Sequence, residues 1–193
     1  MQLSAINDSY TTKGANASHF GKGKIDALGG INVIKGGLAL ADTLYHHEAI
    51  NTAYANKKTY NVTLSDRTLT KNNEWNTLCL PFNVTVGSGV MTGATAMTLD
   101  DETSGFNSES GVLTLNFDNV PSGNTIAAGT PFIVKWTGTD VTNPVFSGVT
   151  VSSANHDVTS TDGKVQFLGT YAPVTFNSQD QSVLFLSANN TLY

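Results

Sequence analysis

Apolar and polar residues alternate along much of the chain after residue 59. Tyr60, Val62 and Leu64 alternate with polar residues, and a longer alternating run covers residues 77–86. A period of two predicts β-strands that place one face on a core. The apolar face of the longer run consists of Leu78, Leu80, Phe82, Val84 and Val86. Pro81 lies within this run and cannot donate a ladder hydrogen bond, which predicts an edge strand or a bulge there.

Further short strands are expected at residues 96–99, 112–117, 131–136, 145–151, 165–168, 174–176 and 183–186. Turn-forming residues separate several of them, as in 121–124 and 161–163. The continuous apolar stretches 132–134 and 183–186 predict strands that are covered on both faces. The pattern therefore favours an all-β fold, an antiparallel β-sandwich or barrel-like domain.

Two segments near the N-terminus favour helix instead. In residues 24–34, Ile25, Leu28 and Ile31 recur at helical spacing, although two glycines cost about 1 kcal/mol each relative to alanine. Such a helix needs a neighbour to pack on. A second, more polar helix is expected at residues 46–55. The fold thus includes a short N-terminal helical segment, and the chain changes character near residues 36–37.

Composition narrows the range of partners. Charged residues make up 13 % of the chain, the net charge is −5, and Lys57-Lys58 is the one basic cluster, so no nucleic-acid partner is predicted. No apolar run approaches the roughly 20 residues that span a bilayer.

The single cysteine allows no intrachain disulfide, and the low charge with 26 threonines and 19 asparagines fits an exported protein. A secreted or cell-surface location in a bacterium is the resulting prediction.

No local motif assembles an active site, so no catalytic residue, metal ligand or cofactor is predicted. A nucleophile elbow is absent, and Cys79 fits a small packed residue on the alternate face of its strand. His46 and His47 are adjacent, so on a helix they point about 100° apart and do not chelate as an i, i+4 pair does. Residues 100–102 are all acidic, which is typical of a solvated turn, with calcium binding as the open alternative.

Three aromatic residues are the candidate ligand-binding residues: Trp75, Trp136 and Tyr171. The tryptophans flank expected strands, which favours core or rim positions over a platform on which a sugar ring stacks. Both interpretations stay open from the sequence. The second would make the chain a carbohydrate-binding module for a cell-surface or dietary glycan.

The opening residues contain a glycine turn followed by the start of the expected helix, with Gly21, Gly23, Ile25, Asp26 and Ala27. This stretch resembles the glycine turn and helix near the C-terminus of the catalytic domain of subtilisin-like serine peptidases. The resemblance implies that residues 1–36 are the last part of an upstream domain. The family's catalytic motifs would precede them, so no catalytic role passes to this chain.

Four segments of the remainder carry a second resemblance, in order along the chain: 59–84, 127–136, 167–174 and 184–193. Together they resemble a β-rich C-terminal module of secreted and surface proteins from gut-dwelling Gram-negative anaerobes. It implies an accessory domain over residues 37–193 that continues beyond residue 193, so a truncated domain is expected. The leading hypothesis is a non-catalytic structural or interaction module attached to an upstream domain, which the first resemblance implies to be a peptidase; the alternative is carbohydrate binding.

Overall fold

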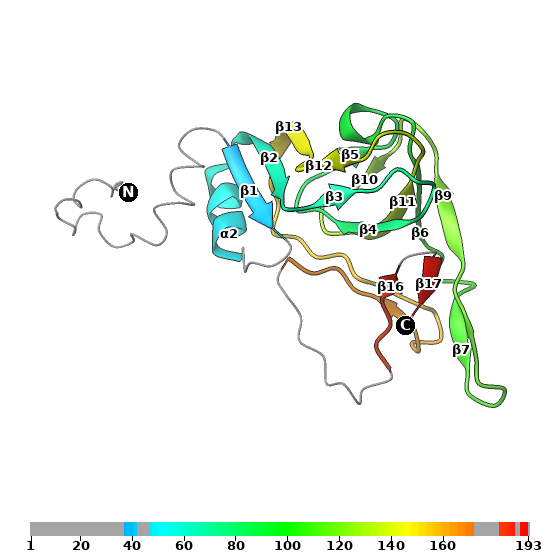
Figure 1. Cartoon of the computed structure of the whole chain (residues 1–193). Helices are drawn as coiled ribbons and strands as arrows, with labels where there is room; N and C mark the ends of the chain where they lie inside the picture. The colour runs from blue at the N-terminus through cyan, green and yellow to red at the C-terminus, as the bar shows by residue number, and fades with distance from the viewer. Residues whose placement is uncertain (1–36, 42–46, 172–181, 188–189, 193) are drawn as a thin grey trace.

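A computed structural model describes residues 37–41, 47–171, 182–187 and 190–192 (Figure 1). The predicted helix at 24–34, the predicted strand at 174–176 and the resemblance to a peptidase end over residues 1–36 lie outside these ranges, as do His19 and His46. Within them the all-β prediction is confirmed, because short strands dominate and there is one α-helix.

The helix is α2 (His47–Asn56), within one residue of its predicted position. The first six strands are β1 (Gly37–Ala41), β2 (Thr59–Ser65), β3 (Thr68–Leu69), β4 (Asn76–Cys79), β5 (Val84–Thr85) and β6 (Thr95–Leu99). The next are β7 (Gly105–Asn107), β8 (Val112–Thr114), β9 (Phe117–Val120), β10 (Thr125–Ile126), β11 (Pro131–Lys135), β12 (Val141–Thr142) and β13 (Val145–Thr150). The last are β14 (Val158–Thr159), β15 (Gln166–Phe167), β16 (Leu186–Ser187) and β17 (Thr191–Leu192).

Two larger sheets build the body of the molecule. One has the order β1-β2-β13 and the other the order β4-β11-β6-β9, and the remaining strands pair two by two. All pairings are antiparallel except β1 with β2, which is parallel. Helix α2 connects these two strands, and a crossover of this kind is what parallel neighbours require. The antiparallel prediction is therefore correct for every described pair but this one.

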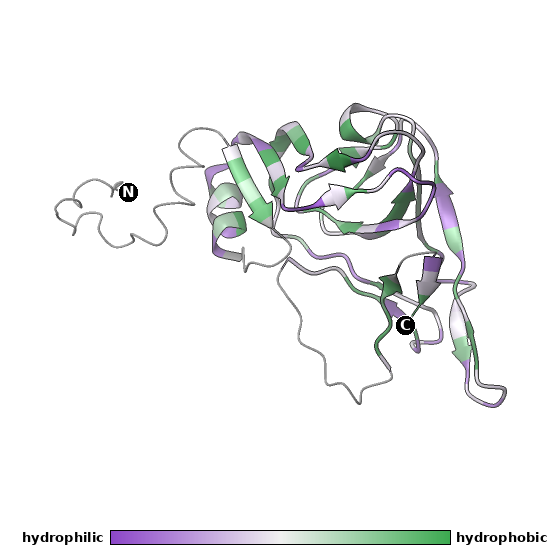
Figure 2. Cartoon of the chain, viewed as in Figure 1, coloured by the Kyte–Doolittle hydropathy of each residue, from purple (hydrophilic) through white to green (hydrophobic). Residues whose placement is uncertain are grey.

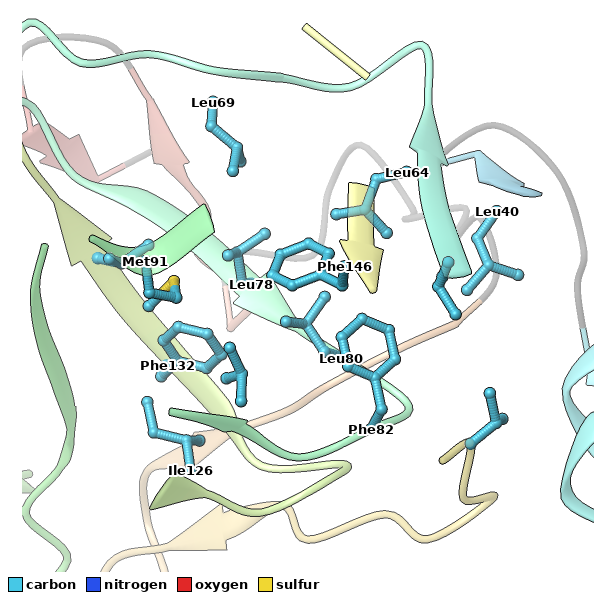
Figure 3. Packing of buried hydrophobic residues seen from close by; sticks show 14 of the residues in the cluster. Leu40, Leu64, Leu69, Leu78, Leu80, Phe82, Met91, Ile126, Phe132 and Phe146 are labelled. Carbon is cyan, nitrogen blue, oxygen red and sulfur yellow. The ribbon is translucent and has the colours of Figure 1, made fainter. Parts of the chain in front are cut away.

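One apolar core joins the two sheets and the helix (Figure 3). The alternating run at 77–86 places all five of its apolar residues in this core, as predicted. The rings of Phe82 and Phe146 lie 5.1 Å apart and link the strand run to β13. Helix α2 adds Ile50 and Ala53, which are spaced by three residues and so share one helix face. Burying each large side chain contributes about 1.5–3 kcal/mol.

Pro81 interrupts the long alternating run. Strand β4 ends at Cys79 and β5 begins at Val84, so the proline falls in the break between them. Its carbonyl oxygen accepts a hydrogen bond from the Ser152 backbone N–H at 2.7 Å, which holds the broken segment beside the end of β13. The predicted irregularity is confirmed, and β4 is also an edge of its sheet.

The four-stranded sheet is covered on both faces. Phe132 and Val134 face the core, while Ile133 on the opposite face is only 8 % exposed, which confirms the prediction for residues 132–134. Described C-terminal segments cover that opposite face. The Phe167 ring meets the Phe117 ring edge-on at 5.9 Å, and Asn190 Oδ1 accepts the Trp75 backbone N–H at 2.9 Å.

The corresponding prediction for residues 183–186 is wrong. Leu184 is 46 % exposed and Phe185 is 57 % exposed. These residues lie on the surface of the molecule, where a strand can bury only one face, and only Leu186 enters a strand, the two-residue β16. A continuous apolar run does not reveal on which layer its strand will lie.

Candidate functional site

A long hairpin extends beyond the body and forms its most exposed feature (Figure 1). It is built from β6 and β9 at its base and from β7 and β8 at its far end, with a turn at residues 100–104 between β6 and β7. We call residues 100–116 the arm. The two-stranded part pairs Phe106 with Leu113, so these apolar side chains lie side by side on one face.

The arm buries almost nothing. No residue of β7 or β8 is buried, whereas β2 and β4 in the body bury every second residue. Phe106 and Leu113 are each 39 % exposed and Val112 is 53 % exposed. Figure 2 shows hydrophobic residues on this outlying hairpin, away from the core. Apolar side chains that leave the body in this way are typical of contact surfaces.

The turn at the base of the arm is organised by Asp100. Its carboxylate accepts the backbone N–H groups of Glu102 at 2.9 Å and Thr103 at 3.1 Å, and the Thr103 hydroxyl at 2.5 Å. The Thr103 hydroxyl, followed by these backbone donors, lowers the pKa of Asp100 below its ordinary value. The carboxylate thus stabilises the turn. In the described ranges, no three histidine, cysteine or acidic residues gather as metal ligands do.

Ser104 forms hydrogen bonds across the hairpin at the position where β6 ends and β7 begins. Its hydroxyl accepts the Asn116 N–H at 2.9 Å and donates to the Asn116 carbonyl oxygen at 3.2 Å. The residue is only 5 % exposed. A side chain therefore replaces the missing backbone pairing at this irregular position and keeps the two strands of the hairpin in line.

A second clamp holds β7 from outside. Asp162 lies in the turn between β14 and β15, and its Oδ2 accepts the Phe106 N–H at 3.1 Å, while Oδ1 accepts the Ser160 hydroxyl at 2.6 Å and the Lys164 N–H at 2.9 Å. These hydrogen bonds, that from Ser160 first, lower the pKa of Asp162. A Cβ atom at Gly105 would lie 2.7 Å from Asp162 Oδ2, so a larger residue here would push this carboxylate out of its present position.

A wide, open depression of about 490 Å³ lies between the arm and this turn. Its lining is mostly polar and consists of Thr103, Ser104, Gly105, Phe106, Asn107, Ser108, Glu109, Thr114, Asp162 and Lys164. The depression is shallow and polar, unlike the enclosed, largely apolar pockets in which small-molecule ligands bind.

The outer edges of the strands differ in how they are protected. On the β4 edge, Arg67 Nη2 donates to the Thr77 carbonyl oxygen at 2.7 Å. The outer edge of β7 carries the Asp162 clamp. By contrast, nothing in the described part of the chain pairs with the outer edge of β8 or β9. We call this outer edge, residues 112–120, the arm edge.

Charge is distributed unequally between the arm and the body. Residues 100–120 contain five of the 15 acidic residues and none of the ten lysines and arginines, so the rest of the chain has ten of each. The five acidic residues are Asp100, Asp101, Glu102, Glu109 and Asp118. The whole net charge of −5 is therefore carried by the arm and β9.

The two tryptophans do not form a common platform. Trp136 is 4 % exposed, belongs to the core, and is covered by the Lys71 ammonium group 5.1 Å from its ring. Trp75 is half-buried on the opposite side of the sheet, where Lys135 Nζ lies 4.7 Å from its ring. Trp136 thus offers no ring face to a sugar in this conformation, and Trp75 retains part of one.

Tyr171 and Cys79 pack together next to the break at Pro81. The Tyr171 hydroxyl donates to the Ala154 carbonyl oxygen at 3.0 Å and also interacts with the Cys79 side chain. Burial raises the pKa of the Cys79 thiol to about 11, so the reactive thiolate is scarce at neutral pH. Cys79 is a packed thiol, as predicted, and Tyr171 is engaged in holding a loop.

The comparisons with known proteins supply no relative. A scan against family models found no match, and searches of curated proteins and of solved structures found none. None of the helices in the described part is long and apolar enough to cross a membrane. The sequence reasoning did not single out the arm as a site, although the absence of lysine and arginine from residues 100–120 was a signal that could have found it.

Proposed function

We propose that the chain is a non-catalytic interaction module in which a closed β-body supports the arm, and the arm makes contact with another macromolecule. The observation that carries this proposal is the contrast in burial. Strands β7 and β8 bury no residue, yet Ser104 and Asp162 hold them in place by specific hydrogen bonds. A hairpin that adds no core but is positioned by two clamps is typical of an element kept for binding.

The reactive groups in the described part support the non-catalytic interpretation. Asp100 and Asp162 use their carboxylate oxygens to hold turns, and Cys79 is a protonated, packed thiol. These side chains stabilise loops, which is the role that a support domain requires.

The test is a variant in which an Asn-Gly turn replaces residues 105–114. We expect its free energy of unfolding, from urea titration, to stay within about 0.5 kcal/mol of wild type, because no buried side chain is removed. The purified chain should also leave a panel of peptide, ester and glycoside substrates intact. A loss of several kcal/mol would make the arm part of the fold, and turnover by the chain would overturn the non-catalytic proposal.

Carbohydrate binding remains the second candidate because Trp75 is half-buried beside Lys135. Retardation of the chain in a polysaccharide-containing gel, lost in Trp75→Ala but kept in Trp136→Phe, would support it. Equal mobility of wild type and Trp75→Ala in every polysaccharide would exclude this residue as a sugar platform.

We also propose that the module belongs to a secreted or surface-attached bacterial protein with an upstream subtilisin-like peptidase domain. The support is the composition and the two resemblances in the sequence. A serine nucleophile motif encoded shortly upstream of Met1 would support the peptidase parent, and an unrelated upstream domain would refute it.

A further inference from the structure

The arm edge is a strand edge with which no described strand pairs. Every second residue of an edge strand directs its N–H and C=O groups away from its neighbour. On β9 these groups face away from β6, and no described strand pairs with them. Proteins normally protect such edges with lysine, proline or a covering segment. Residues 112–120 contain neither lysine nor proline, and the irregularity at 115–116 is the one interruption.

The surface beside the edge suits a strand with alternating side chains. Phe106 and Leu113 lie on one face of the two-stranded part, and Val112 lies on the other. An added strand places successive side chains on alternate faces. Its apolar side chains can therefore pack against these exposed residues while its backbone pairs with the edge, which is the β-augmentation mode of peptide recognition.

The charge of the arm indicates the class of partner. Residues 100–120 hold five acidic side chains and no basic one, and Glu109 and Asp118 are exposed members of this set along the hairpin. Two copies of the chain would bring like charges together if their arms paired, which opposes self-association through this edge. A basic segment would instead be attracted and oriented by the same field.

From these three observations we infer that the arm edge binds an extended, lysine- or arginine-rich segment of a partner protein by adding it as a strand next to β8 and β9. This inference rests on the proposed function, because it names the class of partner for the same arm. It excludes a second copy of the chain as the main occupant.

The probe is a capped peptide of about nine residues that alternates lysine and valine, matched to peptides with glutamate or serine in place of lysine. Binding to the whole chain is followed by backbone NMR. We expect the lysine peptide to shift the amides of residues 105–120 and to slow hydrogen exchange along 112–120. We expect binding to weaken with added salt, and the glutamate peptide to fail.

Matched variants test the role of charge. Glu109→Lys and Asp118→Lys should each weaken the lysine peptide about threefold, and together about tenfold. Glu48→Lys makes the same change of charge on helix α2, away from the arm, and should leave the affinity unchanged. A lysine peptide methylated on alternate backbone nitrogens should lose binding, because it cannot complete the ladder.

Several outcomes would overturn the inference. Equal binding of the serine peptide to the arm would show that the partner need not be basic, although the arm would still be a contact element. Equal binding of the methylated peptide would show that the peptide is not added as a strand. Binding elsewhere, no binding, or a concentration-dependent dimer that disappears in Glu109→Lys would each refute the inference, whereas the proposed function is decided separately by the shortened-arm variant.

Discussion

The body and the arm are both made of short antiparallel strands, but they are stabilised in different ways. In the body, alternate residues of β2 and β4 enter one apolar core, so side-chain burial holds the strands. In the arm, β7 and β8 contribute no residue to the core, and the side chains of Ser104 and Asp162 hold the hairpin by accepting backbone hydrogen bonds. The difference shows that the residues that stabilise the fold by burial lie in the body, while those of the arm stay exposed.

The largest expected effect contrasts two phenylalanines. Phe82 is fully buried and Phe106 is 39 % exposed. Phe82→Ala should lower the free energy of unfolding by about 3–5 kcal/mol, because it removes a core side chain and leaves a cavity. Phe106→Ala should change it by about 0.5 kcal/mol or less. Urea unfolding of both variants checks the pair, and similar losses would abolish the distinction between body and arm.

The next effect concerns pH and belongs to the body alone. The pKa of Cys79 is raised from 9.0 to about 11 in the folded chain. The unfolded thiol ionises first as pH rises, so this contribution to stability is complete below pH 9 and is lost towards pH 11. Two pKa units correspond to about 2.7 kcal/mol, of which about 2 kcal/mol is lost by pH 11.

Cys79→Ala isolates this term. Between pH 8 and pH 11 the wild-type chain should lose about 2 kcal/mol more than the variant does in urea unfolding. Groups that do not contact Cys79 titrate in both proteins and cancel in the difference, whereas Tyr171, whose raised pKa depends partly on Cys79, adds its coupling to that difference. Equal alkaline losses in the two proteins would show that the thiol is not shielded by the fold.

A smaller effect should be confined to the arm. Ser104→Ala removes the hydroxyl that pairs with both backbone groups of Asn116, at a cost of about 1 kcal/mol. Because the arm adds no core, the global unfolding energy should barely move, while amides of β7 and β8 exchange about fivefold faster. Ser110→Ala, in the exposed tip, is the control. A global loss of the full amount would show that arm and body unfold together.

The sequence predicted the parts of the molecule that burial controls. The alternation at 77–86 and the apolar stretch at 132–134 reflect a core on one side and on both sides of a strand, so they could be interpreted correctly. Residues 183–186 show the same kind of run but lie in an outer layer, and no local pattern distinguishes the two cases. The parallel pairing of β1 with β2 likewise depends on the path of α2.

The candidate site could not be predicted from the sequence in the same way. Strands β7 and β8 bury no face, so their sequences carry no alternation imposed by a core. The clamp joins Asp162 to Phe106 across 56 positions, and only the folded chain brings them together. Trp75 and Trp136 both flank strands, but one enters the core and the other the opposite surface, which their sequence context could not decide.

Residue-resolved amide hydrogen exchange of the whole chain tests the separation of body and arm most directly. Amides in β2, β4 and β11 should exchange only through global unfolding, with free energies equal to that from urea titration. Amides in β8 should exchange through local opening at a free energy several kcal/mol lower. Equal protection of β8 and β4 would contradict the account, because the arm would then be part of the cooperative core.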